Sequence, residues 1–138
     1  MNFNEKNGKI VLVKGRKGEE MKILIVDDAT FMRNFLFDNM KKCGFEVIGE
    51  ACDGKEAIQK YIKLKPDIVT MDITMPKMNG IEALKEIIKI DEDAKVVMIS
   101  DIGQHDKIIE AIKNGATDFI IKPVHPDRLK ESLEKVFA

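Results

Sequence analysis

The sequence predicts a doubly wound α/β fold, in which five strand–helix units, (βα)5, build one parallel sheet. From Met21 onward, short apolar runs rich in Ile and Val alternate with longer segments whose apolar residues have helical spacing. Several runs are continuous, which is typical of strands buried on both faces of a parallel sheet. The chain has 138 residues, 44% of them hydrophobic, which is enough for the core of one domain. Right-handed crossovers then place helices on both faces of the sheet.

The five expected strands are the apolar runs themselves. Three of them are continuous and rich in β-branched residues, namely Ile23–Val26, Ile68–Met71 and Val96–Ile99. The other two are Val47–Ile48 with its flanking residues and the short run Phe119–Ile121.

Five amphipathic helices are expected after these runs, because apolar residues there recur at i, i+3 and i+4. The apolar groups are Phe31, Phe35, Leu36 and Met40; Ala57, Ile58, Tyr61 and Ile62; Ile81, Leu84, Ile87 and Ile88; Ile108, Ala111 and Ile112; and Leu129, Leu133, Val136 and Phe137.

Residues at the ends of these segments favour the same helices. Lys41–Gly44 would end the first helix with two cations and a glycine, and Asn114–Gly115 would end the fourth in a similar way. Asp53–Gly54 and Asn79–Gly80 are typical of helix entries. Pro126 fits the first turn of the last helix.

Residues 1–20 differ from the rest of the chain. They carry a net charge of +2, against −3 for the remainder, and Ile10–Val13 predicts one short strand with no partner in view. We interpret them as an N-terminal extension, either disordered or an artefact of an upstream start. The second reading rests on Lys17–Glu20, whose purine-rich codons can resemble a ribosome-binding sequence just before Met21. The alternative is an arm that adds an edge strand or makes an intermolecular contact. The folded domain is expected to span 21–138.

Composition excludes several classes of protein. Lys and Arg (23) nearly balance Asp and Glu (24), which argues against a nucleic-acid-binding protein and against disorder. No apolar run approaches the roughly 20 residues that a membrane span needs, and no secretory signal precedes the first strand. Cys43 and Cys52 lack CxxC spacing, which favours two reduced thiols and a cytoplasmic location.

Polar residues follow four of the five apolar runs, at the strand ends where open parallel sheets bind ligands. Asp27 and Asp28 follow the first run, Asp72 the third, Ser100 the fourth and Lys122 the fifth. We therefore expect three carboxylates, one hydroxyl and one ammonium group at one edge of the sheet. Each residue alone is a weak signal, since Asp commonly opens turns, and the prediction depends on the whole set.

This set of groups favours phosphoryl transfer. Three ionised carboxylates need a counter-charge, and a site with few oxygen ligands suits Mg²⁺. A lysine is suited to a phosphate or a carboxylate. Metal, ammonium and hydroxyl around one free carboxylate fit a reaction that depends on positioning and charge neutralisation. The carboxylate can itself be the nucleophile, which gives an acyl phosphate. The bond Lys122–Pro123 can be cis and would then redirect the backbone beside the lysine.

With these residues the chain resembles the receiver domains of two-component signalling, and among them the stand-alone receivers of chemotaxis. The resemblance covers residues 21–138 and implies a flavodoxin-like sheet of strand order 2-1-3-4-5. It is carried by Ile25–Asp28, Met71–Gly80, Ser100, Gly115–Ala116 and Phe119–Pro123.

The resemblance implies a role for each site residue. Asp72 would accept a phosphoryl group from a histidine kinase. The Mg²⁺ ligands would be Asp27, Asp28, Asp72 itself and the backbone carbonyl of Thr74. Lys122 would pair with the phosphoryl group, Ser100 would swing in to bond it, and Phe119 would follow as the switch aromatic.

The implied function is that of a single-domain, monomeric response regulator, a switch rather than a classical enzyme, which transfers phosphoryl to its own Asp72 with Mg²⁺. It would bind a downstream partner through about Gln104–Val136 when phosphorylated. In chemotaxis the partners would be a histidine kinase, a flagellar or archaellar motor switch or adaptor, and a phosphatase. The alternatives are a phosphorelay shuttle, a pseudo-receiver that never takes phosphate, and an aspartate-nucleophile phosphatase, for which the chain has no room for a cap.

Two residues stand apart from this pattern. Asp101 follows Ser100, where the family usually has a small residue. Its carboxylate would face the phosphoryl site and oppose its charge, point to solvent, or cap the fourth helix. His105 is expected at a helix start, as a capping or surface residue rather than a relay histidine.

Overall fold

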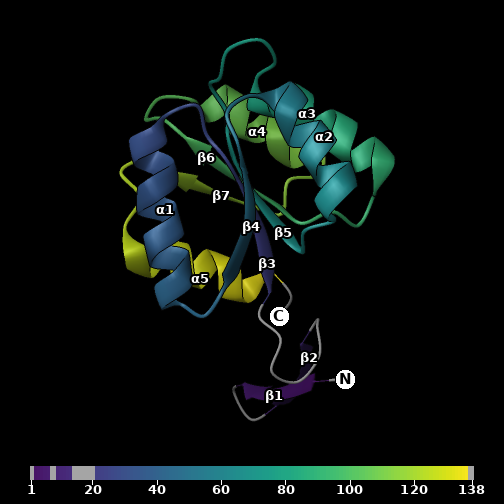
Figure 1. Ribbon diagram of the computed structural model, residues 1–138, viewed down its shortest axis with the longest axis vertical. Coiled ribbons are helices and arrows are strands. Elements are labelled where there is room, and N and C mark those ends of the chain that lie inside the picture. Colours follow the sequence, from purple (N-terminus) through teal and green to yellow (C-terminus); the bar gives the residue numbers. More distant parts are fainter. Residues whose placement is uncertain (1, 7–8, 14–20, 137–138) are drawn as a thin grey trace.

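The computed structural model describes residues 2–6, 9–13 and 21–136. Its main body is a five-stranded parallel sheet in the order β4-β3-β5-β6-β7, which is the predicted order 2-1-3-4-5 counted from Met21 (Figure 1). The strands are β3 (Lys22–Val26), β4 (Glu46–Ala51), β5 (Ile68–Asp72), β6 (Val96–Ser100) and β7 (Asp118–Ile121).

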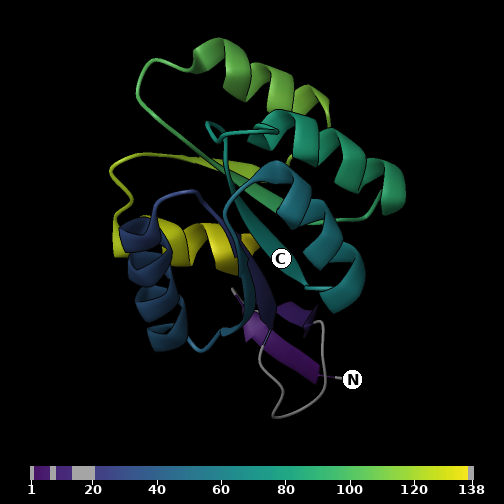
Figure 2. The same ribbon diagram turned by 45° about the horizontal axis from the view of Figure 1, so that its top comes forward.

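Five helices cover the two faces of this sheet. Figure 2 shows α1 and α5 on one side and α2, α3 and α4 on the other. The helices are α1 (Thr30–Lys42), α2 (Gly54–Leu64), α3 (Gly80–Ile90), α4 (His105–Lys113) and α5 (Pro126–Lys135). None of the helices in the described ranges is long and apolar enough to cross a membrane.

The continuous apolar runs are explained by two separate cores. Ile23 and Ile25 of β3 pack into the core beneath α1 and α5. Leu24 and Val26, which alternate with them, pack into the core beneath α2, α3 and α4. Successive side chains of a strand point to opposite faces, so a strand with a core on each face needs apolar residues at every position.

The weak run around Val47 and Ile48 is explained by its place at the edge of the sheet. The residues of β4 before Ala51 are exposed or half-buried, and the register with β3 shifts between Ile23 and Leu24. A strand with one neighbour and partial burial needs fewer apolar side chains, so its sequence signal is weaker.

The predicted helix ends are confirmed. Asp53 Oδ1 accepts a hydrogen bond from Glu56 N–H at 2.9 Å, at the start of α2. Asn79 caps α3 in the same way, and Pro126 lies in the first turn of α5. Gly115, just after α4, has a φ of +102°, in the left-handed region that favours glycine.

Some predicted core positions are wrong. Phe31 is 73% exposed, because it lies in the first turn of α1 and not against the sheet. Ile62 and Ile112 are also exposed, since each extends the apolar stripe of its helix beyond the face that the sheet covers. Phe137 lies outside the described residues.

Two further strands precede the domain. β1 (Asn2–Lys6) and β2 (Lys9–Val13) pair as an antiparallel two-stranded sheet. The strand expected at Ile10–Val13 is therefore present, and its partner is β1, which the sequence did not predict. In the described residues this sheet is separate from the five-stranded one, so the run does not add an edge strand to it. Whether translation starts at Met21 stays a prediction, which a native mass beginning at Met1 or Asn2 would refute.

Candidate functional site

The predicted polar residues meet at the carboxyl edge of the five-stranded sheet. Asp27 directly follows β3, Asp72 and Ser100 are the last residues of β5 and β6, and Lys122 directly follows β7. Because parallel strands end at the same edge, the fold brings together residues that are far apart in the sequence (Figure 1).

Three carboxylates form the centre of the site. One oxygen each from Asp27, Asp28 and Asp72 lies within 4.8 Å of the others. Asp27 and Asp72 are buried, whereas Asp28 is exposed. The site is therefore open to solvent on one side and closed by the sheet on the other.

Several buried polar atoms of this site lack a hydrogen-bond partner. Asp27 Oδ2, Asp72 Oδ1 and Ser100 Oγ are buried and make no hydrogen bond within the described part of the chain, although Asp72 Oδ1 forms an ion pair with Lys122 Nζ at 3.4 Å. A buried polar atom without a partner costs about 1–3 kcal/mol. A hard cation beside the carboxylates and an anion beside the hydroxyl would satisfy these atoms, so the donor set fits Mg²⁺ and a phosphoryl group.

The electrostatics of the site also favour a cation. Burial, and then the charge of Asp27, raise the pKa of Asp72 from 3.8 to about 6. Burial likewise raises the pKa of Asp27, against the hydrogen bond that Asp27 Oδ1 accepts from Ala29 N–H at 2.9 Å. Lys122 Nζ lies 3.4 Å from Asp72 Oδ1 and opposes the raised pKa of Asp72. Burial acts to lower the pKa of Lys122, but the neighbouring carboxylates outweigh burial, so the pKa is raised. The carboxylate of Asp72 contributes most to this rise.

Arg33 supports the backbone at the first carboxylate. Its Nη1 donates to the carbonyl oxygen of Asp27 at 2.7 Å, and its Nε donates to Glu50 at 3.1 Å. This role of Arg33 was not predicted from the sequence. The available signal was its position one helical turn into α1, on the segment that directly follows the two aspartates.

Gly80 lets helix α3 approach the end of β5. A Cβ atom at this position would lie 2.0 Å from the carbonyl oxygen of Asp72. The Gly80 N–H donates to the carbonyl of Ile73 at 2.8 Å, which holds the start of α3 against the strand. The backbone of the predicted acceptor is therefore fixed by a contact that only glycine permits.

The loop after β6 places Asp101 beside the lysine. Asp101 Oδ1 lies 3.8 Å from Lys122 Nζ. The backbone N–H of Asp101 donates to Gln104 Oε1 at 2.8 Å, and Gln104 Nε2 donates to Thr74 Oγ1 at 3.0 Å. Among the described residues, the Asp101 carboxylate makes no bond to an amide of α4, so it is not a helix cap. The Asp101 side chain is 55% exposed, so its carboxylate is open to solvent at the edge of the site while it lies within reach of Lys122.

The remaining predicted residues are placed as follows. The bond Lys122–Pro123 is cis. His105 is exposed at the first residue of α4. Phe119 is half-buried against the core under α2, α3 and α4, and with α4 and Ile121 it lines an apolar groove in the predicted partner-binding region.

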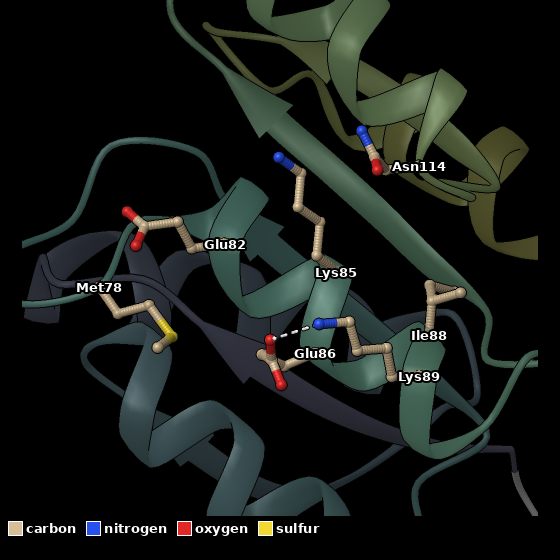
Figure 3. Close-up of a pocket in the computed structure, with 7 residues that line it drawn as sticks. All are labelled: Met78, Glu82, Lys85, Glu86, Ile88, Lys89 and Asn114. Atoms are coloured by element: carbon tan, nitrogen blue, oxygen red, sulfur yellow. Dashed lines mark hydrogen bonds and ion pairs between the residues drawn. The ribbon is translucent and has the colours of Figure 1, made fainter.

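Two other features lie outside this site. Figure 3 shows a pocket along α3, closed on one side by Asn114 after α4, in which Lys89 pairs with Glu86 at 3.2 Å. Lys85, which also lines this pocket, pairs with Glu110 of α4 at 3.1 Å. The group Cys52, Asp53 and Glu56 could also hold a metal ion. Asp53 already caps α2 and lies 3.7 Å from Lys77 Nζ, so this group does not resemble the open acidic site.

Known proteins resemble both the sequence and the fold. The sequence profile of the response regulator receiver domain family matches residues 23–134. The chemotaxis protein CheY of Thermotoga maritima is 61% identical over 115 residues, which cover 83% of this chain and 96% of that protein. CheY of Bacillus subtilis is 54% identical over 114 residues, or 83% of this chain and 95% of that protein. The crystal structure of the CheX–CheY–BeF3–Mg²⁺ complex from Borrelia burgdorferi contains a similar chain, with a TM-score of 0.85, 39% identity, and coverage of 88% of this chain and 92% of that chain.

Proposed function

This chain belongs to the response regulator receiver domain family, and we propose that it is a chemotaxis switch activated by phosphorylation of Asp72. Receiver domains are phosphorylated signalling switches rather than classical enzymes, they bind Mg²⁺, and this one is closely related to CheY proteins. One observation carries the choice of Asp72. Its buried carboxylate has an oxygen within 4.8 Å of an oxygen of Asp27 and of Asp28, and Lys122 Nζ lies 3.4 Å from it.

The proposed reaction moves a phosphoryl group from a histidine kinase to Asp72. One carboxylate oxygen attacks phosphorus, the N–P bond of the phosphohistidine breaks, and the imidazole leaves with the electron pair. Lys122 neutralises charge on the phosphoryl oxygens, and the Ser100 hydroxyl, which is buried without a partner, donates a hydrogen bond to one of them.

The proposed Mg²⁺ ligands are Asp27, Asp28, Asp72 and the backbone carbonyl of Thr74. A bound Mg²⁺ would offset the negative charge of the carboxylates and of the incoming phosphoryl group. Asp27→Ala should therefore weaken Mg²⁺ binding, because it removes one ligand from a sparse set. Titration of the purified protein with Mg²⁺ measures this affinity, and an unchanged value would reject the role of Asp27.

The acceptor is tested with acetyl phosphate and Mg²⁺. The wild-type protein should gain one phosphoryl group by intact mass, and Asp72→Asn should gain none while keeping its fold. Asp93→Asn is the matched control, since Asp93 is an exposed carboxylate in the loop after α3, at the other end of that helix. Labelling of Asp72→Asn at the wild-type rate would place the acceptor elsewhere.

The chemotaxis assignment rests on similarity to CheY proteins and on partner binding by the CheY chain of the CheX complex. We propose that phosphorylation changes the groove between α4 and β7, where Phe119 lies, and that a motor switch or an adaptor binds there. A pull-down with and without beryllofluoride, a phosphoryl mimic, tests the assignment. Phosphate-dependent recovery of a motility protein would support chemotaxis, whereas recovery of a histidine phosphotransfer protein would show a phosphorelay shuttle.

A further inference from the structure

The ammonium group of Lys122 is shared between two carboxylates on different elements. It lies 3.4 Å from Asp72 Oδ1 at the end of β5 and 3.8 Å from Asp101 Oδ1 in the loop after β6. The Asp72 side chain is 3% exposed, whereas that of Asp101 is 55% exposed. Lys122 therefore bridges the buried acceptor and a carboxylate at the surface.

The loop itself holds Asp101 in this position. Its backbone N–H is bound by the side chain of Gln104, and the same side chain donates to the hydroxyl of Thr74 in the loop after β5. Lys122 N–H donates to the carbonyl oxygen of Ser100 at 2.8 Å, which fixes the backbone of the lysine beside the residue that precedes Asp101. Backbone contacts on both sides thus keep the Asp101 carboxylate within reach of the ammonium group.

We propose that Asp101 competes with Asp72 for the Lys122 ammonium group and that this competition slows phosphorylation. The inference rests on the proposed role of Asp72 as the acceptor. When acetyl phosphate is the donor, a bond forms between an Asp72 oxygen and phosphorus, the bond from phosphorus to the acetate oxygen breaks, and acetate leaves with the electron pair. Negative charge accumulates beside Asp72 during this step, and Lys122 neutralises it less well while it is paired with Asp101.

Simple repulsion of the donor by Asp101 is a different mechanism with a different signature. Repulsion acts on the donor directly and does not need Lys122. Competition acts only through Lys122, so it disappears when the ammonium group is removed. A double-mutant cycle between Asp101 and Lys122 separates the two mechanisms.

The first experiment compares labelling rates of the full chain with acetyl phosphate and Mg²⁺. Asp101→Asn keeps the shape of the side chain and removes its charge, and we expect labelling about fivefold faster, which corresponds to about 1 kcal/mol. Asp106→Asn, an equal charge change on the exposed first turn of α4, should stay within about twofold of the wild type. The advantage of Asp101→Asn should shrink as salt screens the exposed ion pair. Equal rates for Asp101→Asn and Asp106→Asn would overturn the proposal.

The second experiment repeats the Asp101→Asn substitution in a Lys122→Met background and measures labelling rate and affinity for beryllofluoride. In this background we expect Asp101→Asn to increase neither the labelling rate nor the affinity for beryllofluoride. A gain of the same size in this background would show direct repulsion and refute the competition for Lys122. Since Asp101 is largely exposed, its replacement should leave the thermal midpoint nearly unchanged, so a rate effect cannot be ascribed to unfolding. Absence of labelling in the wild-type protein would instead reject Asp72 as acceptor, and the inference would fall with it.

Discussion

Replacing Asp72 by Asn should stabilise the metal-free protein near neutral pH, although it removes the proposed acceptor. In the absence of a cation, the Asp72 carboxylate is buried beside Asp27, and its pKa is raised from 3.8 to about 6. Folding then favours the protonated form. The stability contributed by this group is fully present below the unfolded pKa and is lost as the pH rises through about 6.

The size of the effect follows from the shift in pKa. Each pKa unit corresponds to about 1.4 kcal/mol, so a shift from 3.8 to about 6 corresponds to about 3 kcal/mol once the group is ionised. The Asp72 side chain is 3% exposed, so little of this is screened by solvent. Asn keeps the shape and carries no charge at any pH. The free energy of unfolding of Asp72→Asn minus that of the wild type should therefore grow by about 3 kcal/mol between pH 3 and pH 8, with most of the change between pH 4 and pH 7.

Urea denaturation in the presence of a chelator measures this difference at a series of pH values. Asp93→Asn is the control for removing an exposed carboxylate, and its difference from the wild type should stay flat. Added Mg²⁺ should stabilise the wild type more than Asp72→Asn, because binding to the folded state adds to its stability. The raised pKa of Asp72 would be refuted if, without metal, the wild type and Asp72→Asn had the same free energy of unfolding at pH 7 and at every other pH tested.

Three further predictions concern Gly80 beside the acceptor, Asp118 at the start of β7, and Lys122. Gly80→Ala should destabilise the protein by about 3 kcal/mol in urea denaturation, because its Cβ would lie 2.0 Å from the Asp72 carbonyl oxygen. The control is Gly44→Ala, where φ is +86° and nothing lies within 4 Å of the added Cβ, so the loss of stability should be only about 1 kcal/mol. Equal losses for the two variants would refute the contact at Gly80. Burial acts to raise the pKa of Asp118, but the hydrogen bond from Ser132 at 2.7 Å and nearby cations outweigh it and lower the pKa. Asp118→Asn should therefore lose about 2–4 kcal/mol at pH 7 and progressively less as the pH falls below 3.8, and a loss independent of pH would contradict an ionic role. Lys122→Arg keeps the positive charge but changes the shape of the cationic group. The variant should still bind Mg²⁺ in titrations, but after phosphorylation it should bind the partner poorly. Full partner binding by the phosphorylated variant would count against direct contact between Lys122 and the phosphoryl group.

From Met21 onward, the sequence alone was sufficient to predict the order of elements and which residues meet at the carboxyl edge of the sheet. Runs such as Ile68–Met71 predict buried strands because a strand between two cores needs apolar side chains at every position. Caps such as Asn79 are local, since the bonded amides are two and three residues away. Asp27, Asp72 and Lys122 could be grouped from sequence because parallel strands share a carboxyl edge, so position at a strand end already implies proximity.

Only the tertiary structure decided how the loops above the sheet arrange their side chains. Gln104 reaches Thr74 across 30 residues of sequence, and Asp101 lies beside Lys122 although the two residues are on different loops. The exposure of Phe31 was equally undetermined, because helical spacing shows which residues share a face but not where the sheet beneath them ends. Loop geometry depends on contacts between segments that have no common periodicity, so neither residue type nor spacing encodes it. The pairing of Asp101 with Lys122, on which the proposed control of phosphorylation depends, is therefore a property of the folded chain.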